Sequence, residues 1–162
     1  MTAYDACMSA RTPFRVRNCS IERTLAIVGE KWTFLVLREA FNGVRRFADM
    51  QEGTGAPRQV LSARLSRLVE EGLLGKVPYR EPGRRVRHEY RLTQKGLDLY
   101  PILVSLMQWG DIHMAESGPP VVLTHRGCGA PVGVHLSCAE GHEVSSPREV
   151  TPTHGPGSRL AG

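Results

Sequence analysis

The sequence predicts a mainly α-helical domain with one small β-hairpin, an α+β fold. Apolar residues recur at helical spacing in four stretches before residue 72 and in another after residue 93. Between them, two short stretches rich in β-forming residues flank the turn sequence Glu81-Pro-Gly-Arg-Arg. The chain has 162 residues, of which 41% are hydrophobic, so it can bury one ordinary core.

Three helices are predicted in the first third of the chain. Ser20 is a favourable N-cap for a helix through Val28, where Gly29 ends it. Lys31–Phe41 is apolar on most sides, which indicates a buried helix. A short helix over Arg45–Gln51 is followed by Glu52-Gly-Thr-Gly-Ala, a sequence typical of a turn.

The fourth predicted helix runs from about Ala56 to Glu71, with Pro57 in its first turn. Leu61, Leu65 and Leu68 lie on one apolar stripe, which we expect to face the core. The opposite side carries short polar and basic residues. This outer face consists of Gln59, Ser62, Ala63 and Ser66, with Arg58 and Arg67 on its flanks.

The hairpin is predicted from two strands, Leu73–Tyr79 and Val86–Leu92. The second strand alternates, since Val86, His88, Tyr90 and Leu92 share one side and Arg87, Glu89 and Arg91 the other. The turn between the strands carries Arg84 and Arg85 at its tip.

A long final helix is predicted from Thr93, its N-cap, to about Glu116, and Pro101 should kink or restart it. Beyond Gly118 the composition shifts to glycine, proline and cysteine, and Val121–Val144 has the pattern of a small two-stranded unit. The predicted organisation is a flexible arm over 1–18, one domain over 19–117, a small β appendage over 118–144 and a disordered tail over 145–162.

Basic residues concentrate in one part of the chain. Residues 31–95 hold 14 of the 21 Lys and Arg residues but only 7 of the 16 Asp and Glu residues. Clustered arginine in a small domain indicates a polyanionic partner such as nucleic acid. A solvated basic face is the alternative that charge alone leaves open.

Three helices, a turn, a further helix and a hairpin with an arginine tip form the order of a winged helix-turn-helix. The helix after the turn must enter a major groove, so its outer face needs side chains that reach base edges. Gln59 can read adenine, Ser62 can contact a purine or a phosphate, and Arg58 guanine or the backbone. The hairpin arginines that suit neighbouring phosphates or the minor groove are Arg84, Arg85 and Arg87.

Six motifs between Cys19 and Gly110 resemble, in order and spacing, the HxlR-type family of winged-helix regulators, relatives of the MarR-type repressors. They are Cys19-Ser-Ile-Glu-Arg-Thr-Leu, Gly29-Glu-Lys-Trp-Thr-Phe-Leu-Val-Leu-Arg-Glu, Arg46-Phe-Ala-Asp-Met, Val60-Leu-Ser-Ala-Arg-Leu-Ser-Arg-Leu-Val-Glu-Glu-Gly-Leu, Glu89-Tyr-Arg-Leu-Thr-Gln-Lys-Gly and Trp109-Gly110.

This resemblance implies a homodimer joined by the first and last helices. Its two recognition helices would lie about 34–36 Å apart and bind double-stranded DNA at a near-palindromic operator. It implies no enzymatic activity and no required cofactor. We therefore predict a cytoplasmic, sequence-specific repressor; the alternative is a winged-helix protein-protein interaction module that does not bind DNA directly.

The hydropathy of the chain is consistent with a cytoplasmic protein. No stretch approaches the roughly 18 consecutive apolar residues of a membrane span, so no membrane partner is expected. Residues 1–11 lack the apolar block of a signal peptide. In a reducing cytosol the four cysteines indicate thiols, metal ligands or redox switches before disulfides.

Cys19 is the candidate for redox sensing. It lies at the start of the first predicted helix, two residues after Arg17. A helix N-terminus and a nearby cation favour a reactive thiolate, and the resemblance allows a sensor of oxidants or quinone-like electrophiles at this position. A small structural cysteine is the alternative. Cys7 could act as a resolving thiol or be incidental.

A small aromatic or apolar effector is the other candidate signal. Trp32, Tyr100 and Trp109 mark an expected pocket between the first, second and last helices; core or interface packing is the alternative for the two tryptophans, and the one that their large buried area favours. Arg64 borders the apolar stripe, and the sequence leaves open whether it contacts DNA or pairs with a carboxylate such as Glu39.

The C-terminal segment suggests a structural zinc site. His125-x2-Cys128 and Cys138-x3-His142 together offer two imidazoles and two thiolates, a tetrahedral set that suits zinc. Gly141 stands where a Cys-x2-Cys pair would place its second cysteine. A bare hairpin, with a Cys128–Cys138 disulfide under oxidation, is the alternative.

Overall fold

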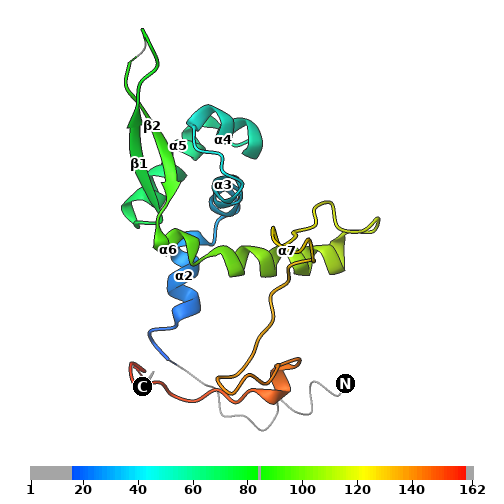
Figure 1. Ribbon diagram of the computed structural model, residues 1–162. Helices are drawn as coiled ribbons and strands as arrows, with labels where there is room; N and C mark the ends of the chain where they lie inside the picture. Colours follow the sequence, from blue (N-terminus) through cyan, green and yellow to red (C-terminus); the bar gives the residue numbers. More distant parts are fainter. Residues whose placement is uncertain (1–15, 84, 160–162) are drawn as a thin grey trace. The chain divides into compact units, whose positions relative to one another are not determined.

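The structure, a computed structural model, describes residues 16–83 and 85–159 (Figure 1). The chain divides into two compact units, Leu25–His135 and a smaller one that combines Met1–Thr24 with Leu136–Gly162. The elements are α2 (Ser20–Val28), α3 (Lys31–Phe41), α4 (Phe47–Thr54), α5 (Arg58–Glu70), β1 (Leu74–Tyr79), β2 (Arg87–Leu92), α6 (Gln94–Leu97), α7 (Tyr100–Met114) and a short 3-10 helix, η1 (Pro147–Glu149). This order confirms the predicted α+β fold.

The core of the larger unit lies where α5 packs on α3. Leu61, Leu65 and Leu68 of α5 are buried, as are Val36 and Leu37 of α3. On α5 these residues recur at three- or four-residue spacing, and on α3 the buried Thr33 lies three and four residues before Val36 and Leu37, so each helix has one buried side. Burial of each large side chain is worth about 1.5–3 kcal/mol. The outer side of α5 is consequently left free of the core.

Helix α4 is longer than the sequence indicated. The turn predicted at Glu52 was wrong, because the helix continues to Thr54 and ends at Gly55 in a left-handed conformation (φ +67°). The hydroxyl of Thr54 donates to the Met50 carbonyl at 2.7 Å, a local bond that satisfies this helical turn. The glycines that suggested a turn therefore lie inside the helix and at its C-cap.

The hairpin pairs β1 with β2 in an antiparallel register from Leu74↔Leu92 to Tyr79↔Arg87. Each strand begins one residue later than predicted. A third short segment joins the hairpin, since Arg46 forms a bridge with Glu89 and the Tyr90 amide donates to the Arg45 carbonyl at 2.8 Å. The start of α4 is thus attached to the hairpin by its backbone.

The predicted final helix is broken into α6 and α7. The Thr93 hydroxyl accepts from the Gly96 amide at 3.2 Å, which confirms the predicted N-cap. Pro101 lies in the first turn of α7, where the missing amide hydrogen costs nothing, so the helix restarts there. The helix ends at Met114, two residues before the predicted Glu116.

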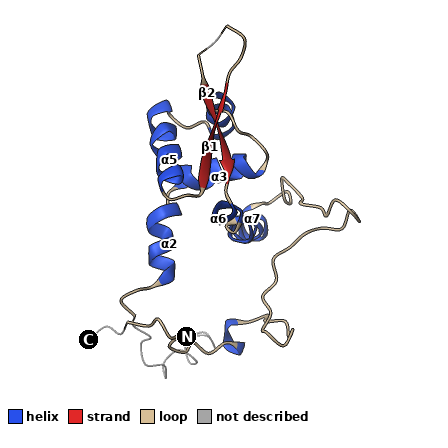
Figure 2. Ribbon diagram, turned by 60° about the vertical axis from the view of Figure 1, so that its left-hand side comes forward, coloured by secondary structure: helices blue, strands red, loops and turns tan. Residues whose placement is uncertain are grey.

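The paired strands predicted over 121–144 are replaced by two isolated bridges, Thr124↔Pro131 in the larger unit and Ser137↔Glu143 in the smaller, within a segment drawn as loop in Figure 2. Glycine and proline disfavour a strand ladder here. The Val134 amide bonds instead to the side chain of Gln108, at 3.0 Å.

The tail, predicted to be disordered, contains η1 within the smaller unit. Asn18 fastens this tail by two hydrogen bonds. Its amide nitrogen donates to the Gly157 carbonyl at 2.8 Å, and its side-chain oxygen accepts from the Arg159 amide at 3.0 Å.

A buried carboxylate joins α3 to the end of α4. Glu39 is only 8% exposed, and its Oε1 accepts from Arg38 Nε at 2.8 Å. Arg38 Nη2 also donates to the Gly53 carbonyl at 2.9 Å. A Cβ at Gly53 would lie 2.6 Å from Glu39 Oε2, so only glycine permits this close approach. We call these three residues the Arg38–Glu39–Gly53 node.

Gly53→Ala is expected to lower the free energy of unfolding by about 1–3 kcal/mol, because the buried Glu39 cannot move aside without loosening its bond to Arg38. Without the clash, alanine would be the better helix residue by about 1 kcal/mol. Urea unfolding followed by circular dichroism measures the change. Gly75→Ala in β1 is the control, since its nearest atom would be 4.0 Å away. Unchanged stability of Gly53→Ala would contradict this account of the node.

Candidate nucleic-acid interface

The turn between α4 and α5 is held by its own hydrogen bonds. The Thr54 hydroxyl accepts from the Ala56 amide at 3.2 Å, and Ala56 itself is buried. Pro57 precedes the first residue of α5 with φ −55°, a value that the proline ring favours. With Gly55 in the left-handed region, these residues set the angle at which α5 leaves α4.

The outer face of α5 is open to solvent. Gln59, Ser62, Ala63 and Ser66 are all exposed. Arg58 is exposed too, and its guanidinium lies 5.0 Å from the centre of the Phe47 ring. Short hydrogen-bonding side chains on an accessible helix are what base-edge contact requires. Contact of these residues with DNA stays a prediction.

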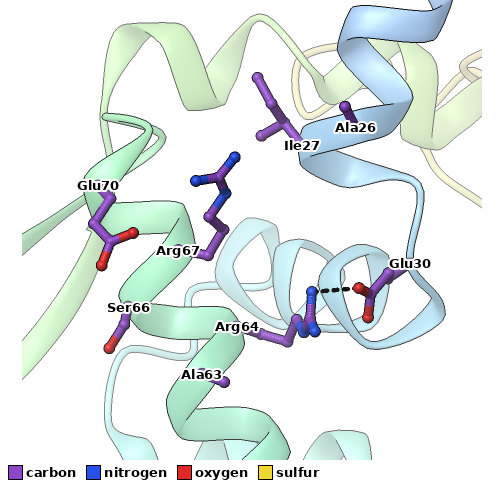
Figure 3. Close-up of a pocket in the computed structure, with 8 residues that line it drawn as sticks. All are labelled: Ala26, Ile27, Glu30, Ala63, Arg64, Ser66, Arg67 and Glu70. Atoms are coloured by element: carbon purple, nitrogen blue, oxygen red, sulfur yellow. Dashed lines mark ion pairs between the residues drawn. The ribbon is translucent and has the colours of Figure 1, made fainter.

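The C-terminal part of this outer face lies beside acidic residues (Figure 3). Ala63, Ser66 and Arg67 border a hollow of about 410 Å³ that Glu30 and Glu70 also line. Arg67 is engaged further, because its Nη2 lies 2.8 Å from Glu71 Oε1. Glu30 is paired with Arg64, whereas no ion pair among the described residues compensates Glu70. The Glu70 carboxylate repels DNA phosphates, so the C-terminal part of the face is the less favourable one for DNA.

The N-terminal part of the face comprises Arg58, Gln59 and Ser62. Within the described chain Arg58 forms no ion pair, so its charge is available to a phosphate or a guanine. These three residues form the stronger candidate for base contact.

Arg64 has a partner that sequence reasoning missed. Its Nη1 lies 2.7 Å from Glu30 Oε1, in the loop between α2 and α3 (Figure 3). Of the two roles that the sequence left open for Arg64, the structure contains the internal pair with a carboxylate. The carboxylate is Glu30 in place of Glu39, because Arg38 occupies Glu39. Arg64 Nε is buried and has no hydrogen-bond partner. Arg64 therefore ties α5 to the α2–α3 junction, a contact between segments far apart in the sequence.

The hairpin presents its arginines outward. Arg85 and Arg87 are exposed, whereas Arg84 lies outside the described residues. In Figure 1 the hairpin projects beyond the helices, as a wing does. Burial raises the pKa of Tyr90 at its base, so that hydroxyl stays neutral at physiological pH.

Arg46 fastens the wing to the start of α4. Its Nη1 lies 3.0 Å from Glu81 Oε1, its Nε 3.8 Å from Glu89 Oε1, and its guanidinium 4.6 Å from the centre of the Tyr79 ring. In the sequence, Arg46 stands out only as part of a family motif. The available signal was the presence of acids, Glu81 and Glu89, on an otherwise basic hairpin.

Cys19 occupies the position predicted from the sequence, at the start of a helix. Its carbonyl accepts from the Arg23 amide at 3.1 Å, which makes it the residue that precedes the first turn of α2. Its thiol is free and only partly exposed. Cys7 lies outside the described residues.

The three residues predicted to line an effector pocket are not brought together. Tyr100 lines an apolar pocket between α3 and α7, but neither tryptophan does. Trp32 packs against the core, with Lys31 Nζ 4.7 Å from its ring centre. Trp109 is 57% exposed and pairs with the ring of His113, at 5.0 Å between centres. The positions of Trp32 and Trp109 in the sequence do not indicate which side of its helix each ring occupies.

The four candidate zinc ligands form two local pairs. His125 Nδ1 lies 3.4 Å from Cys128 Sγ, and Cys138 Sγ lies 3.4 Å from His142 Nδ1. Each pair closes a tight turn that contains a glycine at positive φ. In residues 16–83 and 85–159 no three His, Cys, Asp or Glu side chains are grouped to hold a metal. Cys128 and Cys138 are both free thiols in the structure. The zinc site and the Cys128–Cys138 disulfide therefore both stay predictions.

An exposed helix after a short turn, followed by a basic wing, defines the winged helix-turn-helix class of transcriptional regulators. The model of the HxlR-like helix-turn-helix family matches residues 27–118, and the chain belongs to this family. It is a transcriptional regulator with a helix-turn-helix DNA-binding domain. No described helix is long and apolar enough to cross a membrane.

Relatives with the same fold cover most of the chain. An HTH-type transcriptional regulator of Mycobacterium tuberculosis is 49% identical over 144 residues, which cover 88% of this chain and 90% of that protein. The crystal structure of the transcription factor PA1607 superposes with a TM-score of 0.76 at 33% identity, covering 86% of this chain and 96% of that one. The redox regulator HypR in its reduced form is 25% identical, with a TM-score of 0.53 over 58% of this chain and 92% of that one.

Proposed function

We propose that the chain is a homodimeric repressor that reads a near-palindromic site on double-stranded DNA. The observation that carries this proposal is the exposed N-terminal part of α5, with Arg58, Gln59 and Ser62. Exposed Arg85 and Arg87 on the wing supply a second set of contacts, suited to phosphates. Base edges read by α5 give sequence preference, and the wing adds affinity that falls with salt.

Exposed apolar side chains support the dimer. On α7, Trp109 and Ile112 are exposed, the latter by 76%, and Met114 is exposed as well. Large apolar groups on one helix favour a partner surface, because their burial removes them from water. A second copy that packs against α7 would place two α5 helices about 34–36 Å apart, one turn of DNA.

A protein-protein interaction module is the rival function. Such a module needs no cations on both a helix and a hairpin, whereas this chain exposes Arg58 on α5 and Arg85 and Arg87 on the wing. DNA binding predicts an affinity that falls steeply with salt. Absence of binding to any promoter fragment at low salt would favour the rival.

The proposed division of α5 can be tested by alanine substitution. Arg58→Ala and Gln59→Ala are each expected to weaken binding to the selected operator by about 1–3 kcal/mol and to relax preference at one base pair. Ser66→Ala, on the same face but beside Glu70, is the matched control and is expected to change binding by no more than about 0.5 kcal/mol.

Fluorescence anisotropy with the operator and its single-base variants measures these effects. A loss for Ser66→Ala as large as for Gln59→Ala would show that the acids do not exclude the C-terminal part of the face.

We also propose that Cys19 responds to oxidants. HypR, which the chain resembles, is described as a redox regulator, and Cys19 lies at the start of α2 as a free, partly exposed thiol. The thiolate sulfur would attack one oxygen of hydrogen peroxide, which breaks the O–O bond, leaves a sulfenic acid and releases hydroxide, which takes up a proton from the solvent. The new polar group would disturb the packing of α2 and thereby the dimer.

Cys19→Ser is expected to keep the DNA affinity of the reduced protein and to abolish the release of DNA by peroxide. Gel shifts with and without peroxide measure this release. Cys128→Ser removes an exposed free thiol elsewhere and should leave it unchanged. Peroxide-driven release that persists in Cys19→Ser would rule out this sensor.

A further inference from the structure

An apolar pocket of about 280 Å³ lies in the larger unit, between α3, α7 and residues 121–123. Its volume is just below the roughly 300–1,000 Å³ typical of small-molecule sites. Three separate segments of the chain enclose it, which distinguishes it from a flat helix face. The side chains that matter for its chemistry are Phe34, Phe41, Tyr100, Leu103, Met107 and Leu123.

Aromatic rings dominate one wall of the pocket. Phe41 and Tyr100 pair with their ring centres 4.9 Å apart and their planes inclined at 52°. Aromatic ligands pack well against such tilted rings, because the edge of one ring favours the face of another. Leu103 and Leu123 complete an apolar lining that an alkyl or aryl group would desolvate favourably.

The charge of the lining favours an uncharged ligand. Arg38 is the only lining residue with a charged side chain, and Glu39 neutralises it through the Nε bond of 2.8 Å. An anion would therefore find no unpaired cation, and a cation would find no carboxylate on the wall. Burying an unpaired charge in such a pocket is costly.

We propose that this pocket binds a small uncharged aromatic molecule, and that Arg38 transmits its presence to the helix-turn-helix. The binding step stands by itself, whereas the transmission rests on the proposed function. The pocket differs from the one expected around the two tryptophans, of which only Tyr100 is retained.

Arg38 connects the pocket to the turn before α5. Arg38 lines the pocket, and its Nη2 donates to the Gly53 carbonyl at 2.9 Å. Gly53 is two residues before Gly55, the left-handed residue that ends α4. A ligand that shifts the guanidinium weakens this bond and alters the angle of α5. Ligand and DNA then affect each other's affinity by the same factor.

A second copy of the chain is a poorer occupant. A helix is about 10–12 Å wide with its side chains and needs a long open groove. The pocket instead has a volume of only about 280 Å³, and Val121 and Leu123, which lie outside α3 and α7, form part of its wall. Displacement of a bound probe by dimer formation would reveal such an occupant.

The test uses full-length protein and the uncharged fluorescent probe N-phenylnaphthylamine, with anilinonaphthalene sulfonate as its charged counterpart. The neutral probe is expected to bind at least about tenfold more tightly than the sulfonate. Leu123→Trp fills the pocket and should weaken the neutral probe by about tenfold. Val122→Trp is the matched control, because Val122 is its exposed neighbour and does not line the pocket.

Transmission is tested with Arg38→Lys, which keeps the charge but loses the forked geometry. The neutral probe is expected to lower operator affinity of the natural protein by about fivefold or more and to have no effect on Arg38→Lys. Urea unfolding confirms that each variant is folded.

Equal probe affinity for Leu123→Trp and Val122→Trp would overturn the pocket assignment, as would probe release when the protein dimerises. Intact DNA binding without probe binding would overturn this inference and leave the proposed function standing. Probe binding that follows the predicted pattern without any DNA binding would overturn the proposed function and the transmission, but not the pocket.

Discussion

The ion pair between Arg38 and Glu39 is the contact on which the DNA-binding part of the structure depends. A carboxylate that is 8% exposed needs a partner, and Arg38 supplies it while also holding the Gly53 carbonyl. The node therefore fixes where α4 ends against α3. Gly55 and Pro57 follow within four residues, so the start and direction of α5 follow from the same contact.

Ion pairs determine which arginines of α5 are available to a partner. Arg64 and Arg67 are paired with Glu30 and Glu71, so their charges serve the fold. Arg58, without an ion pair in the described chain, keeps its charge available to a polyanion. Arg46 and Arg64 each join two segments through a carboxylate. Arg46 links the start of α4 to the wing through Glu81, and Arg64 links α5 to the α2–α3 loop through Glu30. The basic excess of residues 31–95 is thus partly structural, and only a subset of it can meet DNA.

Features set by local sequence were predictable, and features set by contacts between distant segments were not. Leu61, Leu65 and Leu68 marked α5, and Pro101 marked a restart, because spacing and backbone chemistry act within a few residues. The partner of Arg64 depends on where the α2–α3 loop comes to lie, which no periodicity encodes. The helical Glu52 was missed for the same reason, as was the lining of the pocket apart from Tyr100, since tertiary contacts around Gly53 and residues 121–123 decide them.

The claim that α5 and the wing of a dimer read DNA is tested most directly by a binding selection on random double-stranded DNA. The account predicts enrichment of an inverted repeat whose half-sites are centred about 10–10.5 base pairs apart, one helical turn. Enrichment of no sequence at low salt, or of a single half-site without a repeat, would contradict it.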